Sequence, residues 1–518
     1  MLIMNMNYGQ GGRARQLARP LSRVRTQMTT TEQAAGAAAA QAAPRHGHWI
    51  GGAQVPPAGG RYFPTSNPAT GETVALVADG DAADIDQAAR AAQQALAGWS
   101  GRPPVERSRI LARISQLIRE DLDELDRLER SETGKLNARG EISYAADYFE
   151  YYAGVLRALT GDVIDIGPQA HAFTRREPWG VVGVITPWNA PLNQAAREIA
   201  PAIAAGNTLV VKPAEATSLS TLRLGELAQR AGLPDGVLNV VSGDGPGAGA
   251  PLVAHPLVRK IAFTGSVATG RRIARAAGER LIPVTMELGG KSPNIIFADA
   301  DLASAVPAAT RAFTGNTGQV CSAGTRLIVQ RAVHDEVVDL VAAQARGLRP
   351  GRHLGPLITQ AQYQKVSGYF DVAVEDGARL VAGGPADLRA ELGPELSGGF
   401  FVQPTVYAGV TMDMRIAREE IFGPVLAVIA FDEEDEAVRV ANDTEHGLVA
   451  GLWTSDIGRA LRVSAKLQAG NVYINGWGAP LDVPFGGYKD SGYGREKGFA
   501  ALEDFTQVKS VVVHGLLP

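Results

Sequence analysis

"GVVGVITPWNAPLNQAAREIAPAIAAGNTLVVKPAEAT", residues 180–217, holds two short apolar runs on either side of a segment with helical spacing. Strands buried on both faces of a parallel sheet read as continuous apolar runs, and the chain crosses between them through a helix. The stretch therefore predicts a strand, a helix and a second parallel strand.

The same alternation continues to residue 290. Apolar runs occur again in "GVLNVVSG" (236–243), "KIAFTGS" (260–266) and "PVTMELGG" (283–290), with helical segments at 219–232 and 270–281 between them. Five strands in about 110 residues predict a doubly wound parallel sheet, which binds ligands at the carboxyl ends of its strands. Asn189, Lys212, Gly265 and Glu287 all fall at predicted strand ends.

The flanking regions extend this α/β pattern. Residues 81–99 and 104–135 have apolar residues at helical spacing and predict two amphipathic helices. A second α/β region follows from about residue 292 to residue 489. Near the end of the chain, "VKSVVV" (508–513) is a β-prone run that needs an edge to pair with, and a neighbouring subunit could supply one.

Composition excludes several classes of partner. The 518 residues are 45% hydrophobic and 20% charged, as in soluble proteins of more than one domain. The net charge of −4, with no long basic run, argues against nucleic acid and an anionic membrane surface, and no apolar stretch is long enough to span a bilayer. The single cysteine fits a reducing compartment, for which we expect the cytoplasm. The scattered histidines predict no metal site.

The first 45 residues differ from the rest of the chain. They begin Arg-rich, carry no acidic residue before Glu32, and continue into the low-complexity run "AAGAAAAQAAP". Such a start can be a transit peptide, although the apolar core of a secretory signal is missing. We favour a disordered extension over residues 1–45, or a true start at Met28, which leaves open whether residues 1–27 belong to the mature protein.

The only cysteine, Cys321, lies in the polar stretch "GNTGQVCSAGTRL" (315–327). A lone cysteine is usually inert packing, but a loop of small polar residues leaves a thiol accessible to a ligand. Glu287, at a strand end before two glycines, is a candidate general base. Its alternative is a structural carboxylate that caps the Gly-Gly turn.

Three stretches suggest a dinucleotide. "FTGSVATG" (263–270) ends a strand and opens a helix, where backbone N–H groups and the Ser266 hydroxyl suit a pyrophosphate. "SGDGPGAG" (242–249) is a weak fingerprint that also fits a plain turn. Glu215, three residues after Lys212, could accept hydrogen bonds from ribose hydroxyls and repel a 2′-phosphate, which favours NAD over NADP; the alternative is a surface ion pair.

Two further stretches complete a family pattern. "VTMELGGKSPNIIF" and "FTGNTGQVCSAGTRL", with Glu287 and Cys321 separated by 321 − 287 = 34 positions, resemble the active-site signatures of the aldehyde dehydrogenase superfamily. "GVITPWNAPL", "VVKPAE", "FTGS", "EEIFGPV" and "PFGGYKDSGYGREKG" match in the family's order. The resemblance covers roughly residues 49–513.

The resemblance implies a domain plan. A Rossmann-like NAD-binding domain would comprise residues 46–157 and 178–287, and a second α/β catalytic domain residues 288–488. A small β arm of residues 158–177 and 489–518 would join subunits into a homodimer or homotetramer.

It also implies roles for the site residues. Cys321 attacks the aldehyde, Asn189 stabilises the oxyanion, and after hydride transfer to the nicotinamide Glu287 activates the water that hydrolyses the thioester. The implied cofactor-binding residues are Ile185, Thr186, Pro187, Trp188, Lys212, Glu215, Gly245, Gly265, Ser266, Gly270, Leu288, Glu420 and Phe422. The implied substrate-pocket residues are Ala190, Asn193, Arg197, Val320, Ser322, Trp477 and Phe485.

The sequence departs from the family pattern on one helix. Many relatives have an aromatic residue after the oxyanion asparagine and a lysine farther along, where this chain has Ala190 and Glu198, with Arg197 beside the latter. If Arg197 faces the substrate, an acidic semialdehyde becomes a candidate; we favour a helix-surface charge, because arginine is rarely buried. Glu198 puts in doubt a proton relay through that lysine.

The most consistent function is NAD-dependent oxidation of a small or medium aldehyde to its acid. The alternatives are a CoA-acylating relative, an inactive structural member of the fold, and a thiol hydrolase with a Cys–His pair. The sequence names neither the aldehyde nor the oligomer.

Overall fold

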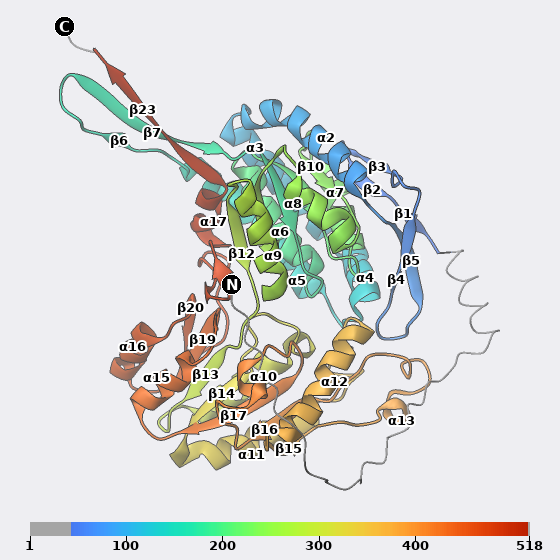
Figure 1. The fold of residues 1–518 in the computed structure, drawn as a ribbon, viewed down its shortest axis with the longest axis vertical. Coiled ribbons are helices and arrows are strands. Elements are labelled where there is room, and N and C mark those ends of the chain that lie inside the picture. Colours follow the sequence, from blue (N-terminus) through green and yellow to red (C-terminus); the bar gives the residue numbers. More distant parts are fainter. Residues whose placement is uncertain (1–42, 516–518) are drawn as a thin grey trace, which may run out of the picture. The chain divides into compact units, whose positions relative to one another are not determined.

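The computed structural model describes residues 43–515. Its larger sheet has eight strands in the order β22-β12-β11-β8-β9-β10-β2-β3 (Figure 1). The five strands at its centre are all parallel and confirm the five predicted from sequence: β8 (Val181–Ile185), β9 (Thr208–Lys212), β10 (Leu238–Val240), β11 (Val258–Thr264) and β12 (Val284–Glu287). The antiparallel β2 (His48–Ile50) and β3 (Ala53–Val55) close one edge, and β22 (Gly492–Tyr493) closes the other.

Helices cover both faces of this sheet. Successive residues of a strand point to opposite faces, and along β8 Val182 and Val184 belong to one hydrophobic cluster whereas Val181 and Ile185 belong to another. The first cluster includes α3 (Pro104–Glu120), α5 (Arg139–Val155), α6 (Pro191–Ala204) and α7 (Leu219–Arg230); the second includes α2 (Ala82–Ser100), α8 (Ala250–Ala254) and α9 (Val267–Glu279). The doubly wound prediction is confirmed.

The prediction of one helix over residues 104–135 is wrong in one respect, because the helix is interrupted at Asp121. There α3 ends and α4 (Leu122–Thr133) begins, with Asp121 at φ −98° and ψ 15°. The Asp121 carboxylate accepts hydrogen bonds from Nε and Nη2 of Arg223 on α7, both at 2.7 Å. This bidentate pair ties the junction to a neighbouring helix, a tertiary contact that local periodicity does not report.

The second sheet has the order β15-β16-β17-β14-β13-β19-β20 and is parallel except at β15. Its strands are β13 (Pro293–Ile296), β14 (Arg326–Gln330), β15 (Arg379–Ala382), β16 (Thr405–Ala408), β17 (Val425–Phe431), β19 (Val449–Trp453) and β20 (Asn471–Ile474). One face packs on α10 (Leu302–Thr314) and α11 (His334–Gly347), and the other on α12 (Gln360–Glu375), α15 (Glu434–Asn442) and α16 (Ile457–Lys466). The predicted second α/β region is thus present.

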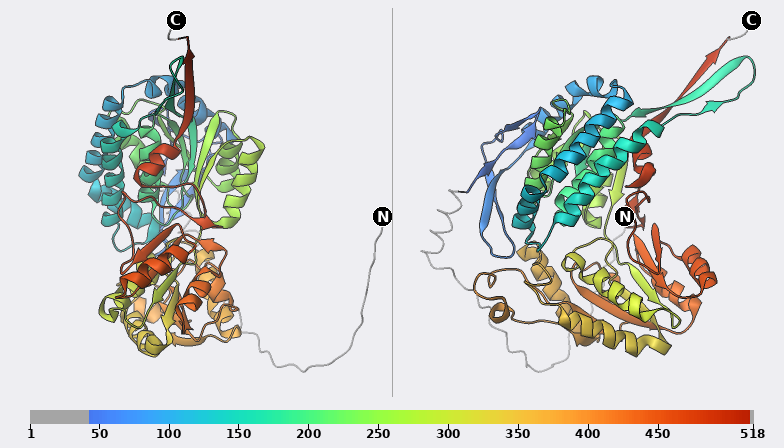
Figure 2. Two further views of the ribbon diagram at one scale, coloured as in Figure 1. Left: turned by 90° about the vertical axis from the view of Figure 1, so that its left-hand side faces the viewer. Right: turned by 180° about the vertical axis from the view of Figure 1, so that it is seen from behind.

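A three-stranded arm leaves the two sheets (Figures 1 and 2). It consists of β6 (Val163–Ile164), β7 (Ala170–Pro178) and β23 (Thr506–His514), and β23 pairs with β7 over nine residues. The edge needed by "VKSVVV" therefore comes from the same chain, while the outer edge of β23 has no strand beside it among residues 43–515.

The structure leaves the N-terminal extension and the domain boundaries untested. The predicted disordered extension lies almost entirely outside the described residues, and the domain boundaries stay a prediction. Within residues 43–515, no helix has the length and apolarity needed to cross a bilayer.

Candidate active site

The carboxyl ends of β8, β11 and β12 open onto a cavity of about 180 Å³. Asn189 follows β8, Ser266 follows β11 and Glu287 ends β12, whereas Cys321 comes from the loop between α10 and β14. The lining residues are Pro187, Trp188, Asn189, Gln194, Thr264, Gly265, Ser266, Glu287, Leu288, Gly289, Cys321, Gln362, Lys365, Glu420 and Phe422.

The loop that carries Cys321 has an unusual backbone. Asn316 and Thr317 have φ of 48° and 56°, a left-handed conformation that costs non-glycine residues energy and often marks functional loops. The Asn316 side chain donates to the Asn189 carbonyl oxygen at 2.8 Å, and Nδ2 of Asn189 donates to the Gln319 carbonyl oxygen at 2.9 Å. An amide nitrogen carries two hydrogens, so Asn189 keeps a second donor for another acceptor.

Gly289 and Gly290 allow two groups to approach the end of β12. A Cβ atom at Gly289 would overlap the Glu420 carboxylate, and one at Gly290 would overlap the Cys321 carbonyl oxygen. The Gly290 N–H donates to Oε1 of Glu420 at 3.2 Å. The carboxylate that caps the Gly-Gly turn is therefore that of Glu420, so Glu287 does not have the capping role considered from sequence.

Glu287 is a buried carboxylate that the Gly487 backbone N–H approaches, but none of the donors among residues 43–515 forms a well-aligned hydrogen bond with either of its oxygens. Burial raises its pKa well above the usual range, and the neighbouring Glu496 raises it further, whereas Arg197 opposes the shift. An unbonded carboxylate with a raised pKa is suited to take a proton near neutral pH.

The Cys321 thiol is reached from the cavity but stays mostly surrounded by protein. Burial raises its pKa to about 12, and Arg197 is the group that opposes this rise. Such a thiol needs a base to become a nucleophile. No histidine among residues 43–515 hydrogen-bonds it, which leaves the Cys–His hydrolase alternative without support in the described structure.

The opposite end of the cavity suits a dinucleotide. Ser266 caps the N-terminus of α9, where free N–H groups and the helix dipole favour an anion. Trp188 and Phe422 meet edge to face, with ring centroids 5.2 Å apart. Glu420 binds Gly290 through Oε1 only, which leaves Oε2 able to accept from a ligand hydroxyl.

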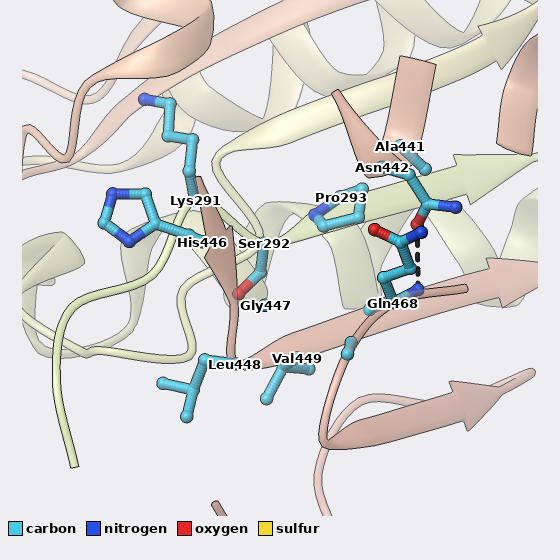
Figure 3. Close-up of a pocket in the computed structure, with 12 residues that line it drawn as sticks. Lys291, Ser292, Pro293, Ala441, Asn442, His446, Gly447, Leu448, Val449 and Gln468 are labelled. Carbon is cyan, nitrogen blue, oxygen red and sulfur yellow. Dashed lines mark hydrogen bonds between the residues drawn. The ribbon is translucent and has the colours of Figure 1, made fainter. Parts of the chain in front are cut away.

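A second, smaller cavity is lined by Lys291 and Ser292, which follow the Gly-Gly turn in sequence, and by His446 (Figure 3). Its volume of about 10 Å³ suffices for one water at most, so it is not a ligand site. Nδ1 of His446 lies 3.1 Å from the Gly289 carbonyl oxygen, and the Ser491 hydroxyl donates to the same oxygen at 2.7 Å. These contacts hold the turn that places Glu287 and Glu420.

Comparison with known proteins agrees with this geometry. The sequence model described as "Aldehyde dehydrogenase family" matches residues 55–511. The chain belongs to the aldehyde dehydrogenase family. It is 44% identical over 486 residues to a betaine aldehyde dehydrogenase of Mesorhizobium japonicum, covering 91% of this chain and 98% of that protein.

Solved structures of aldehyde dehydrogenases show the same fold. An indole-3-acetaldehyde dehydrogenase in complex with NAD⁺ has a TM-score of 0.88 at 37% identity, covering 93% of this chain and 99% of that chain. A betaine aldehyde dehydrogenase of Staphylococcus aureus, also with NAD⁺, has a TM-score of 0.88 at 36% identity, covering 91% and 95%. The protein is an aldehyde dehydrogenase, and its relatives bind NAD.

Most of the predicted catalytic and cofactor-binding residues line the cavity, but several lie around it. Thr186, Ile185 and Gly270 are buried at its margin, with Gly270 packed against Leu288. Lys212 is buried, donates to the Gly243 carbonyl oxygen at 2.8 Å and lies 3.5 Å from the carboxylate of Glu215. The predicted cofactor-binding residues that do not line the cavity are Ile185, Thr186, Lys212, Glu215, Gly245 and Gly270, and none of the seven predicted substrate-pocket residues lines it.

Five lining residues were not predicted: Gln194, Thr264, Gly289, Gln362 and Lys365. Gln362 and Lys365 lie on α12, far along the chain from every motif; Nε2 of Gln362 donates to the Phe422 carbonyl oxygen at 2.8 Å. Thr264 and Gly289 adjoin predicted residues, so the motifs could have included them. Gln194, Gln362 and Lys365 show no sequence feature that predicts their place at the cavity.

On the aldehyde side of Cys321, the helix-surface interpretation of Arg197 is wrong. Its residue exposure is 5%, and its guanidinium pairs with the Glu496 carboxylate and lies 4.6 Å from the Phe485 ring centroid. Cys321 packs against the cluster that Phe485 forms with Leu448 and Val449. Arg197 is thus a buried, paired cation that lies against Phe485 of the same cluster.

Of the remaining predicted substrate residues, only Trp477 packs against the same cluster. Trp477 packs against it together with Tyr473, with ring centroids 5.9 Å apart. Asn193 donates to the Glu141 carbonyl oxygen at 3.2 Å, and Ala190 precedes α6 as its N-cap residue. Val320 and Ser322 flank Cys321 and are half-buried.

Glu198 is buried beside the Arg197–Glu496 pair. Burial raises its pKa well above the usual range, and Glu496 raises it further. A carboxyl group is neutral or negative in either protonation state, so it does not replace the positive charge of the lysine that many relatives have.

Proposed function

We propose that this enzyme oxidises an aldehyde to its carboxylic acid with NAD, through covalent intermediates on Cys321. The observation that carries the proposal is the meeting of Cys321, Glu287 and Asn189 on one cavity whose other end fits a dinucleotide. These three residues come from different segments, and each has a distinct chemical part.

The first step is addition of the Cys321 sulfur to the aldehyde carbon. The carbonyl π electrons move to oxygen, and the free N–H of Asn189 supports donation to that oxygen. Because burial keeps the thiol protonated, its proton must pass to solvent as the bond forms, and the Glu287 carboxylate then stays free for the hydrolysis step.

The cofactor end of the cavity supports NAD. A bound nicotinamide supplies the two-electron acceptor that turns the thiohemiacetal on Cys321 into a thioester. Glu420 offers a free oxygen to ribose hydroxyls, and the Glu215 side chain, 59% exposed beside Lys212, offers a second carboxylate. A 2′-phosphate would meet the negative charge of Glu215, which favours NAD over NADP.

Hydrolysis completes the reaction. Water adds to the thioester carbon, one water proton passes to the Glu287 carboxylate, and the Cys321 sulfur leaves with the C–S electron pair. Release of the acid regenerates the thiol. A carboxylate without hydrogen bonds beside the nucleophile favours this route over transfer to CoA, since thiolysis has less need of a water-activating base.

The test is NADH formation by the purified enzyme with an aldehyde panel, with and without CoA. We expect turnover without CoA, no turnover by Cys321→Ala, and slow turnover by Glu287→Gln. Absence of NADH with every aldehyde would favour an inactive structural role. Turnover that requires CoA would favour the acylating alternative.

Two further parts of the proposal concern the enzyme's setting. The outer edge of β23 and the family likeness support a homodimer or homotetramer, and light scattering that gives a monomer at micromolar concentration would reject it. The single cysteine supports a reducing compartment such as the cytoplasm.

A further inference from the structure

Lys497 is a cation on the aldehyde side of Cys321 that no carboxylate neutralises. Its Nζ lies 5.1 Å from the Phe485 ring centroid and 5.7 Å from that of Tyr144. Among residues 43–515, no carboxylate lies within ion-pair distance of it, since the adjacent Glu496 pairs with Arg197.

The ring of Phe485 links Lys497 to the reacting sulfur. Phe485 belongs to the cluster against which Cys321 packs, and its backbone forms a two-way bridge with Glu496, the residue before Lys497. Tyr144 approaches from α5, where its hydroxyl lies 3.5 Å from the Ala479 carbonyl oxygen. Lys497 and Cys321 therefore both lie against the small cluster that contains Phe485.

The charges around Lys497 leave it uncompensated. Arg197 and Glu496 neutralise each other, and the Glu287 carboxyl that also faces Lys497 lies beyond ion-pair distance of it. Burial and, to a smaller extent, the neighbouring Arg197 lower the pKa of Lys497 to about 8. An anion brought into this region would gain both Coulomb attraction and a charge-assisted hydrogen bond.

The backbone at Lys497 is strained. Its φ of 60° and ψ of 172° fall in a region that is populated almost only by glycine. Glycine would adopt this conformation with less strain. The presence of lysine is therefore not explained by the fold alone.

We propose that Lys497 binds an anionic group of the substrate, so that the enzyme prefers aldehydes that also carry a carboxylate. This rests on the proposed aldehyde oxidation and adds its substrate class. Cationic aldehydes are disfavoured by the same residues, because the ring faces that could hold an ammonium group already lie beside Arg197 and Lys497.

The experiment compares three matched series: ω-oxo acids of four to six carbons, n-alkanals of equal length and ω-trimethylammonio aldehydes. We expect the best ω-oxo acid to exceed its neutral match in kcat/KM by about 10- to 100-fold, the range of one hydrogen bond between charged groups. The trimethylammonio aldehydes should be the poorest substrates.

Three variants separate a role in binding from a role in structure. Lys497→Met should remove the preference for the acid and leave kcat/KM for alkanals within about twofold. Lys497→Arg should restore the preference. Lys497→Gly relieves the strained backbone, so it should also lose the preference without lowering Tm.

The pH dependence supplies a readout that packing alone would not give. The groups facing Lys497 are Arg197, Glu496, Glu287, Cys321 and Tyr144. Since kcat/KM reports the free enzyme, the preference for acids should fall as pH rises through about 8, whereas Lys497→Arg should keep it at pH 9.

Each outcome decides the proposal. An equal kcat/KM for acidic and neutral aldehydes, or an acid preference that survives in Lys497→Met, would overturn it while leaving aldehyde oxidation in place. No NADH from any aldehyde would instead overturn the proposed function.

Discussion

The regions on the two sides of Cys321, the proposed cofactor side and the proposed aldehyde side, differ in the groups that form them. On the cofactor side, backbone groups and strand ends dominate: the N-terminus of α9, the Gly-Gly turn after β12 and the carboxylate of Glu420. On the aldehyde side, side-chain charges and rings dominate, with Arg197 paired to Glu496 and Lys497 near Tyr144 and Phe485. Changes on the first side should affect all aldehydes alike, whereas changes on the second should separate one aldehyde from another.

The largest effect should come from Glu287→Gln, which keeps the side chain's volume and removes its basicity. We expect kcat to fall by about 10²- to 10⁴-fold, the usual range for a general base, and by the same factor for acidic and neutral aldehydes. Steady-state assays on both series would measure this. A loss confined to one series would contradict the assignment of Glu287 to the chemical step.

Breaking the Arg197–Glu496 pair should cost stability. Arg197→Met leaves the Glu496 carboxylate buried without its cation, for which we expect a loss of about 3–5 kcal/mol. The double variant Arg197→Met/Glu496→Gln should recover much of this loss. Denaturant unfolding would measure the free energies, and additive losses would show that the two side chains are not coupled.

A smaller effect is expected from Glu215→Gln on the cofactor side. Removing this exposed charge should raise kcat/KM for NADP relative to NAD by about 10-fold, that is about 1.4 kcal/mol. The ratio should change equally with every aldehyde. An unchanged ratio of kcat/KM for NADP to that for NAD would favour the alternative considered from sequence, in which Glu215 and Lys212 form an ion pair without a role in cofactor choice.

The smallest effect concerns pH. The folded state holds the pKa of Glu198 above its unfolded value, so its contribution to stability is present at low pH and lost as pH rises through the folded pKa. Glu198→Gln, which cannot ionise, should therefore show a flatter decline of Tm with rising pH than the native enzyme. Parallel Tm profiles would indicate that Glu198 is not held protonated.

The difference between the two sides also decides what sequence could predict. Parallel strands repeat apolar runs, and their carboxyl ends meet at one edge, so Asn189, Ser266 and Glu287 were found from local pattern. The break at Asp121 depends on Arg223, about a hundred positions away, and no local pattern reports it.

Arg197 shows the limit most clearly. Arginine on a helix is usually exposed. The burial of Arg197 is offset by its ion pair with Glu496, which lies on a loop near the end of the chain. Gln362 and Lys365 were missed for the same reason, since α12 reaches the cavity only through tertiary packing.

The most direct test of the central claim is the mass of the enzyme after a single turnover. Glu287→Gln, incubated with NAD and one aldehyde and then quenched in acid, should gain the mass of the aldehyde minus two hydrogens, and peptide mapping should place the acyl group on Cys321. NADH formation without this adduct, or an acyl group on another residue, would contradict the account.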